Sequence, residues 1–219
     1  TMDSTSNVRG APPFIVATGG TITTCGDCKI HTFTGPGTFC VSAKSFCSSR
    51  NLLSYVVIAG GGNGGNTTGG GGGGGGFREV KSPLTPYTAS PLDGYCTPAN
   101  RITVTEQGYP IVVGAGGAAS PATNPGSVSS GFSITAAGGG AGGNYGGGVG
   151  CAGGSGGGGA GSAGGPRGGG AGNTPPTTPA QGFAGGNGAS TGPCNGSGGG
   201  GGGATVAGGN APPGSYTPG

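Results

Sequence analysis

The sequence predicts a mainly β protein with much irregular structure and no α-helix. An N-terminal sheet of strands and hairpins should lead into a bundle of polyglycine-II helices with long loops. Three observations predict this class: Gly and Pro contribute 64 and 18 of 219 residues, short apolar runs repeatedly end in glycine, and no apolar period of 3.6 residues is present. Charged residues make up only 6% of the chain, which is unusual for a disordered segment. Backbone hydrogen bonds must therefore supply much of the order.

The composition divides the chain into three parts. Residues 1–13 are polar, end in Ala-Pro-Pro, and are interpreted as a linker or attachment arm. Residues 14–60 form the β-rich N-terminal part. Residues 61–219 form the glycine-rich polyglycine-II scaffold, with strands near 101–113 and 131–137.

The N-terminal part contains the clearest strand signals. Residues 21–24 and 29–33 flank Gly26-Asp27, a pattern typical of a β-hairpin. Gly35-Pro36-Gly37 indicates a second turn, and residues 54–58 form the most strand-like run of the chain.

The later strand signals are shorter. Residues 78–100 mix Pro, Ser and Tyr and predict an excursion loop. Residues 101–105 and 109–113 predict a strand pair, and residues 132–135 predict the last strand.

One unit recurs, in which an apolar run ends in small residues and then glycine, at 14–20, 56–62 and 111–117. The extended polyproline-II conformation has three residues per turn and leaves every backbone N–H and C=O free to bond sideways. Tracts such as 69–76 and 198–203 place glycine at all three positions of that turn. Such helices could approach closely and bond to one another, which predicts a laterally hydrogen-bonded bundle.

Seven cysteines in a chain with a poor apolar core suggest disulfides and an oxidising final location. Cys25 and Cys28 should face each other across the predicted hairpin turn, and a Cys40–Cys47 bridge would close the following loop. The six candidates for disulfides are Cys25, Cys28, Cys40, Cys47, Cys151 and Cys194. The odd total of seven cysteines leaves at least one thiol free or paired between chains. A zinc site at Cys25, Cys28 and His31 is the alternative, but its spacing is incomplete, so no metal is predicted.

No catalytic residue and no cofactor are predicted, and the chain is interpreted as a non-enzyme. Residues 60–65 satisfy G-x-G-x-x-G after a strand, but no helix follows, and the acidic residue expected after a dinucleotide motif is missing. The single histidine, His31, alternates with Ile30 in a strand pattern, and the five acidic residues show no catalytic pairing.

Charge and hydropathy exclude two classes of partner. The net charge is +3 and the basic residues are scattered, which argues against nucleic-acid binding. The sequence contains no run of about 18 apolar residues, so membrane insertion is not predicted. No signal peptide is visible, which fits a mature fragment or a protein released by lysis. Asn66 and Asn195 begin glycosylation sequons, but such sequons also occur by chance in a chain rich in Asn, Ser and Thr.

Aromatic side chains in loops are the best candidates for recognition, because rigid rings beside Gly and Pro form contact surfaces for sugars or proteins. The alternative is that they cover the flanks of the scaffold. The candidate residues are Tyr87, Tyr95, Tyr145 and Phe183. The loops expected to carry recognition are 78–100, 118–130 and 173–195.

The order of residues 21–24, 29–39, 55–62, 76–79 and 108–117 resembles that of glycine-rich structural and tail-fibre (adhesin-like) proteins of tailed bacteriophages, especially marine ones. The resemblance runs from about residue 14 to 210. It implies a sandwich of polyglycine-II helices whose variable loops at the far end touch the host surface. The expected function is a non-enzymatic, extracellular virion-type fibre or adhesin module, with a bacterial cell-surface receptor and copies of itself as partners.

Two other functions remain open from the sequence. The chain could be the subunit of a self-assembling extracellular filament, in which residues 1–13 and the odd cysteine link one subunit to the next. A glycine-rich ectodomain module of a cell-surface receptor is the third alternative, and it would need a membrane span that the sequence lacks.

Overall fold

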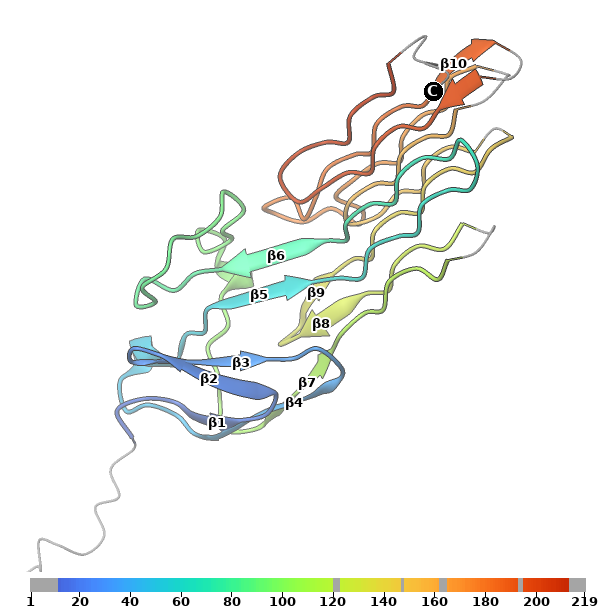
Figure 1. Cartoon of the computed structure of the whole chain (residues 1–219). Helices are drawn as coiled ribbons and strands as arrows, with labels where there is room; N and C mark the ends of the chain where they lie inside the picture. Colours follow the sequence, from blue (N-terminus) through green and yellow to red (C-terminus); the bar gives the residue numbers. More distant parts are fainter. Residues whose placement is uncertain (1–11, 120–122, 147, 162–164, 193–194, 213–219) are drawn as a thin grey trace, which may run out of the picture.

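The computed structural model describes residues 12–119, 123–146, 148–161, 165–192 and 195–212. Most strands gather at one end of the molecule, and glycine tracts run from them to the opposite end, where a short strand pair near the C-terminus lies (Figure 1). We call these the sheet end and the far end. Nearly all of the predicted arm, residues 1–13, lies outside the described residues.

The main sheet has five antiparallel strands in the order β1-β4-β7-β8-β9. These strands are β1 (Val16–Thr18), β4 (Gly37–Ala43), β7 (Gly108–Val112), β8 (Ser129–Gly131) and β9 (Ile134–Ala136). β4 lies between β1 and β7, so the sheet joins segments that are far apart in the sequence.

Three two-stranded sheets complete the β structure. They are β2 (Thr21–Cys25) with β3 (Cys28–Thr32), β5 (Tyr55–Ile58) with β6 (Phe77–Val80), and β10 (Ala189–Gly192) with β11 (Asn195–Ser197). The β2–β3 pair confirms the predicted hairpin around Gly26-Asp27. The described residues contain two short 3-10 helices, η1 (Ser48–Asn51) and η2 (Pro98–Asn100), and no α-helix. The prediction of a mainly β protein without α-helix is confirmed.

Two strand predictions differ from the structure. Residues 101–105 do not form a strand, because only Thr103 makes a bridge, with Leu52. The predicted last strand at 132–135 is instead a hairpin: Phe132 and Ser133 form the turn between β8 and β9, with φ angles of 54° and 66°. β10–β11 was not predicted, since that segment carries none of the β-branched alternation that indicates a strand.

A small apolar core lies beside the main sheet. Phe39, Val41 and Val104 are buried, and partly buried apolar side chains from neighbouring segments pack against them. Phe132 contacts Phe39 and Tyr109, with ring centroids 5.4 and 4.8 Å apart. This core anchors the strands from which the glycine tracts begin.

Candidate functional site

The glycine tracts lie side by side and bond to one another through their backbones (Figure 1). Tract 69–76 donates N–H groups to tract 137–143 at every third residue. The donor–acceptor pairs are Gly70–Gly143, Gly73–Gly140 and Gly76–Ala137, with N···O distances of 2.9, 2.8 and 2.7 Å. The residue number of the acceptor falls as the residue number of the donor rises, so these two tracts are antiparallel.

The same tract bonds to two further neighbours. Gly71 and Gly74 donate to Gly199 and Gly202, again three residues apart and here in parallel. Tract 60–65 donates to the carbonyls of Gly73 and Gly70. Tract 69–76 is therefore held on several sides by backbone bonds, and the Ser155 hydroxyl adds a side-chain bond to the Gly75 carbonyl at 2.8 Å.

The packing explains which positions require glycine. A Cβ atom on Gly70 would overlap the carbonyl oxygen of Gly158, and one on Gly72 would overlap that of Gly62. A Cβ atom on Gly74 would meet nothing closer than the carbonyl oxygen of Gly202, at 3.8 Å. Gly70 and Gly72 thus have no space for a side chain, whereas Gly74 has space for one.

Asparagine and threonine side chains tie the turns together at the far end. Asn66 donates its N–H to the Asn144 side-chain oxygen at 3.0 Å, and the Thr68 hydroxyl donates to the Gly161 carbonyl at 3.0 Å. Tyr145 lies in the same group of turns, and 51% of it is exposed. The bundle thus presents an exposed aromatic ring on turns that are joined by hydrogen bonds.

Two loops meet at the sheet end, one after β6 and one spanning 173–181. The buried Asn100 side chain donates to the Thr178 carbonyl at 2.7 Å and joins the two. Within the second loop, the Asn173 side-chain oxygen accepts from the N–H groups of Thr177 and Gln181, at 2.9 and 3.1 Å. The loop is thereby closed on itself and attached to its neighbour.

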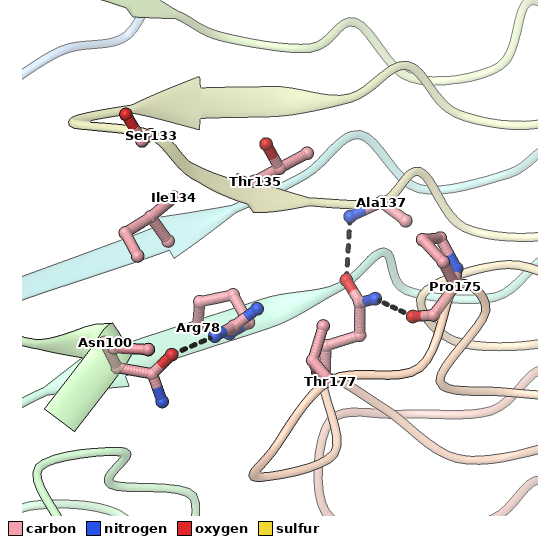
Figure 2. Close-up of a pocket in the computed structure, with 10 residues that line it drawn as sticks. Arg78, Asn100, Ser133, Ile134, Thr135, Ala137, Pro175 and Thr177 are labelled. Carbon is pink, nitrogen blue, oxygen red and sulfur yellow. Dashed lines mark hydrogen bonds between the residues drawn. The ribbon is translucent and has the colours of Figure 1, made fainter. Parts of the chain in front are cut away.

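A cavity of about 290 Å³ lies where these loops meet β6 and β9 (Figure 2). Arg78 supplies its only charged side chain. Gln181 borders it with a fully buried amide, which accepts from the Ala137 N–H at 2.8 Å and donates to the Pro175 carbonyl at 2.7 Å. The remaining lining residues are Ala99, Asn100, Ser133, Ile134, Thr135, Ala137, Pro175 and Thr177.

The loop after β6 also places cations over aromatic rings. The Arg101 guanidinium lies 4.5 Å from the Tyr95 ring centroid, and the Lys81 ammonium lies 6.0 Å from that of Tyr87. Burial, followed by the charge of Glu79, raises the pKa of Tyr87 to about 12, although over a third of the residue is exposed. The Glu79 carboxylate itself is buried and accepts from the Ser90 N–H and hydroxyl.

Comparison with protein families identifies the chain. A family model described as a glycine-rich domain matches residues 34–219, which is most of the sequence. The chain belongs to this glycine-rich domain family. No curated protein and no solved structure matches it.

The aromatic candidates of the glycine-rich domain lie in separate places. Tyr87 and Tyr95 belong to the loop after β6, and Tyr145 to the far end. Phe183 lies near the sheet end, where its N–H donates to the Gly203 carbonyl at 3.0 Å. The structure therefore does not bring all of them into one surface, and their role in recognition stays a prediction.

The cysteines of the chain carry free thiols at every described position, and Cys194 lies outside the described residues. Cys25 and Cys28 are directly paired across the end of the β2–β3 hairpin. The Ser49 hydroxyl, 3.2 Å from the Cys47 sulfur, lowers the pKa of that exposed thiol. The disulfides stay a prediction, and the Cys25–Cys28 pair has the register that a cross-strand bridge would need.

His31 precedes the residues that the family model matches, and it contacts the backbone and a neighbouring ring. Its Nδ1 lies 2.8 Å from the Gly19 carbonyl oxygen, and its ring meets Phe39 edge-on at 4.9 Å. Among the described residues, no group of three or more His, Cys, Asp or Glu side chains could hold a metal ion. In the same part of the chain, no helix has the length and hydropathy to cross a membrane.

Sequence reasoning missed the residues around the cavity. Arg78 is one of several scattered basic residues, and Asn100 and Gln181 are polar residues in segments read as loop or scaffold. Their low exposure, 6% for Asn100 and 1% for Gln181, is a property of the folded chain alone. In the sequence, Gln181 follows Asn173, Pro175 and Pro179 closely, and these turn-forming residues were the only local signal of an ordered loop.

Proposed function

We propose that the glycine-rich domain is a non-enzymatic virion-type fibre or adhesin module, which presents loops for host-surface recognition on a scaffold of polyglycine-II helices. The observation that carries the proposal is the three-residue spacing of the hydrogen bonds between tracts, together with the turns that they align at the far end. The module would act outside cells, with a bacterial cell-surface receptor and other copies of itself as partners.

The spacing favours polyglycine-II helices over strands. A strand directs its N–H groups to one neighbour at every second residue, whereas a helix with three residues per turn does so at every third. Gly70, Gly73 and Gly76 all donate to tract 137–143, and Gly71 and Gly74 donate to tract 198–203. Successive residues thus turn toward different neighbours, as the threefold helix requires.

The scaffold suits the presentation of loops. Its inner glycines leave no space for side chains, so the tracts pack at the distance set by their backbones. Turns that differ in sequence can vary at the far end without disturbing this packing. The resemblance to tail-fibre proteins of tailed phages implies the same division between a constant bundle and variable loops.

The test is binding of the full chain to intact bacteria. We expect fluorescently labelled protein to bind some strains of a panel saturably. Replacement of the exposed Tyr145 by Ala should weaken this binding about tenfold or more, because aromatic anchors dominate interfaces. Phe46→Ala, the control at an exposed aromatic residue shortly after β4, should bind as the wild type does.

Electron microscopy of the native particle distinguishes the adhesin proposal from the filament alternative. The chain should lie at the distal end of a virion appendage, with the turns around Asn66 and Asn144 outermost. A continuous helical array of identical chains, or equal loss of binding in the Tyr145 and Phe46 variants, would contradict the adhesin proposal. The array would instead support the filament alternative.

A further inference from the structure

We propose that the glycine-rich domain binds a small hydroxylated carboxylate, of the uronic-acid type, in the cavity between β6, β9 and loop 173–181. The site lies at the sheet end, away from the far-end turns around Tyr145. The inference goes beyond the proposed function, because it stands whether or not those turns bind a cell surface. Figure 2 shows the residues that line the cavity.

Arg78 supplies the positive charge. One of its terminal nitrogens, Nη2, donates to the Asn100 side-chain oxygen at 2.7 Å, and this is its one hydrogen-bond partner within the described residues. A guanidinium has five N–H donors in a planar fork, so donors remain for a ligand. Asn100 is itself held by the Thr178 carbonyl, at 2.7 Å, so the guanidinium is positioned by a fixed amide.

The outer edge of β9 supplies a neutral donor and acceptor. Ala137, just beyond β9, directs both backbone groups away from β8: its N–H donates to the Gln181 side chain and its carbonyl accepts from Gly76. Backbone groups alternate with a period of two along a strand. Thr135 precedes Ala137 by two residues and lines the cavity, so its N–H and C=O face the same edge.

Apolar atoms and the Gln181 amide limit the size of the ligand. Ile134, Ala99 and Pro175 contribute apolar surface to the lining. The Gln181 side chain is fixed at both ends of its amide, as the two dashed lines at Ala137 and Pro175 show in Figure 2. The volume of about 290 Å³ is at the lower limit for small-molecule sites, which suits one sugar-sized unit.

These groups together select the chemical class. A planar guanidinium binds a carboxylate through two parallel N–H···O bonds. A hydroxyl both donates and accepts, which matches the paired backbone groups of Thr135. The C–H face of a sugar ring matches the apolar wall. A peptide carboxyl terminus is the competing ligand. However, β9 has three residues, and only the backbone groups of Thr135 face its outer edge, which is too short an edge for strand addition.

The test is an NMR titration of the full chain with sodium glucuronate and sodium galacturonate, at matched ionic strength. We expect millimolar binding, with the largest chemical-shift changes at the amides of Thr135 and Ala137. Glucose, which lacks the carboxylate, and acetate, which lacks the hydroxyls, should each bind about tenfold more weakly or not at all. Equal binding of either comparator, or of a short peptide with a free carboxyl terminus, would overturn the assignment.

Two charge-matched variants locate the site. Arg78→Gln should weaken glucuronate binding about tenfold or more, because it removes the charge-assisted pair. Arg101→Gln removes the same charge from a side chain that stacks on Tyr95 outside the cavity, and should change the affinity by less than about twofold. Equal loss in both variants would mean nonspecific attraction and would refute the site.

The fold of the Arg78 variant is checked by its NMR spectrum and thermal unfolding. Arg78→Lys keeps the charge without the planar fork, and should retain part of the affinity. If Arg78→Gln does not fold, the comparison of wild-type binding to glucuronate, glucose and acetate still decides the proposal. Absence of any shift at Thr135 and Ala137 with saturating glucuronate would overturn it.

Discussion

Glycine is required at some positions of the tracts by the atoms around it, and is replaceable at others. A Cβ atom on Gly73 would overlap the carbonyl oxygen of Ser155, a residue that is completely buried. The nearest atom to a Cβ on Gly74 is 3.8 Å away, an ordinary contact distance. Adjacent glycines thus differ in their tolerance of the same substitution.

We expect Gly73→Ala to lower the free energy of unfolding by about 2 kcal/mol or more, since an extra methyl group in a close-packed interior forces backbone shifts. Gly74→Ala is the matched control. It should leave stability unchanged or raise it by up to about 1 kcal/mol, because alanine reduces the entropy of the unfolded chain. Thermal unfolding of both variants measures the difference, and equal melting temperatures would contradict the packing of tract 69–76.

Tyr55 couples the stability of the sheet end to alkaline pH. Its hydroxyl donates to the Asn100 carbonyl at 2.8 Å. Burial, opposed by the charge of Arg78 and reinforced by that of Asp93, raises the pKa of this phenol from 10 to about 12. The folded protein therefore favours the neutral phenol.

The sign of the pH dependence follows from this raised pKa. The stabilisation is fully present below pH 10 and is lost as the pH rises from there through about 12. Thermal unfolding measured across that window should show a fall in melting temperature that is smaller in Tyr55→Phe. An identical alkaline fall in that variant would show that Tyr55 does not carry the effect.

At the scale of the element, the β8–β9 hairpin depends on a turn with unusual backbone angles. Phe132 and Ser133 both have positive φ, as the two-residue turns of hairpins require. Left-handed angles cost an ordinary residue about 1–2 kcal/mol, and glycine avoids that cost. Phe132 compensates through its ring contacts with Phe39 and Tyr109.

Ser133→Gly should accordingly raise the free energy of unfolding by about 1 kcal/mol. Ser130→Gly makes the same change inside β8, where glycine weakens a strand, and should lower it by about 0.5–1 kcal/mol. Chemical denaturation of the two variants measures these changes in the free energy of unfolding, which should be opposite in sign. Destabilisation of both to the same extent would argue against the positive φ at Ser133.

At the scale of the whole molecule, the bundle should behave as one cooperative unit. A free glycine tract is a flexible coil whose amides exchange rapidly with solvent. The amides of Gly70, Gly73 and Gly76 instead donate to tract 137–143, so we expect them to exchange slowly and at a common rate. Hydrogen exchange measured by NMR tests this, with the same protein in denaturant as the reference. Rapid exchange at these three amides would contradict the bundle and the proposed polyglycine-II scaffold.

The sequence by itself determined the secondary-structure class. Strand signals and turns are local, so the hairpin around Gly26-Asp27, the strand at 55–58 and the lack of α-helix among the described residues were all predictable. The cavity could not be predicted, because Arg78, Asn100 and Gln181 come from three separate segments and none has a distinctive sequence context. Residues 101–105 were predicted as a strand, but they form only one isolated bridge, between Thr103 and Leu52.

Only the tertiary structure decided which tract lies beside which. One glycine bonds to another through backbone groups that every residue shares, so the sequence of a tract does not specify its neighbour. The choice of tract 137–143 as a partner for tract 69–76 depends on the strands and turns at their ends, which set the direction and register of each pass. For that reason, the composition predicted that the glycine tracts would pack together. The order of the tracts and the position of the cavity depend on the pairing of the strands, which only the tertiary structure shows.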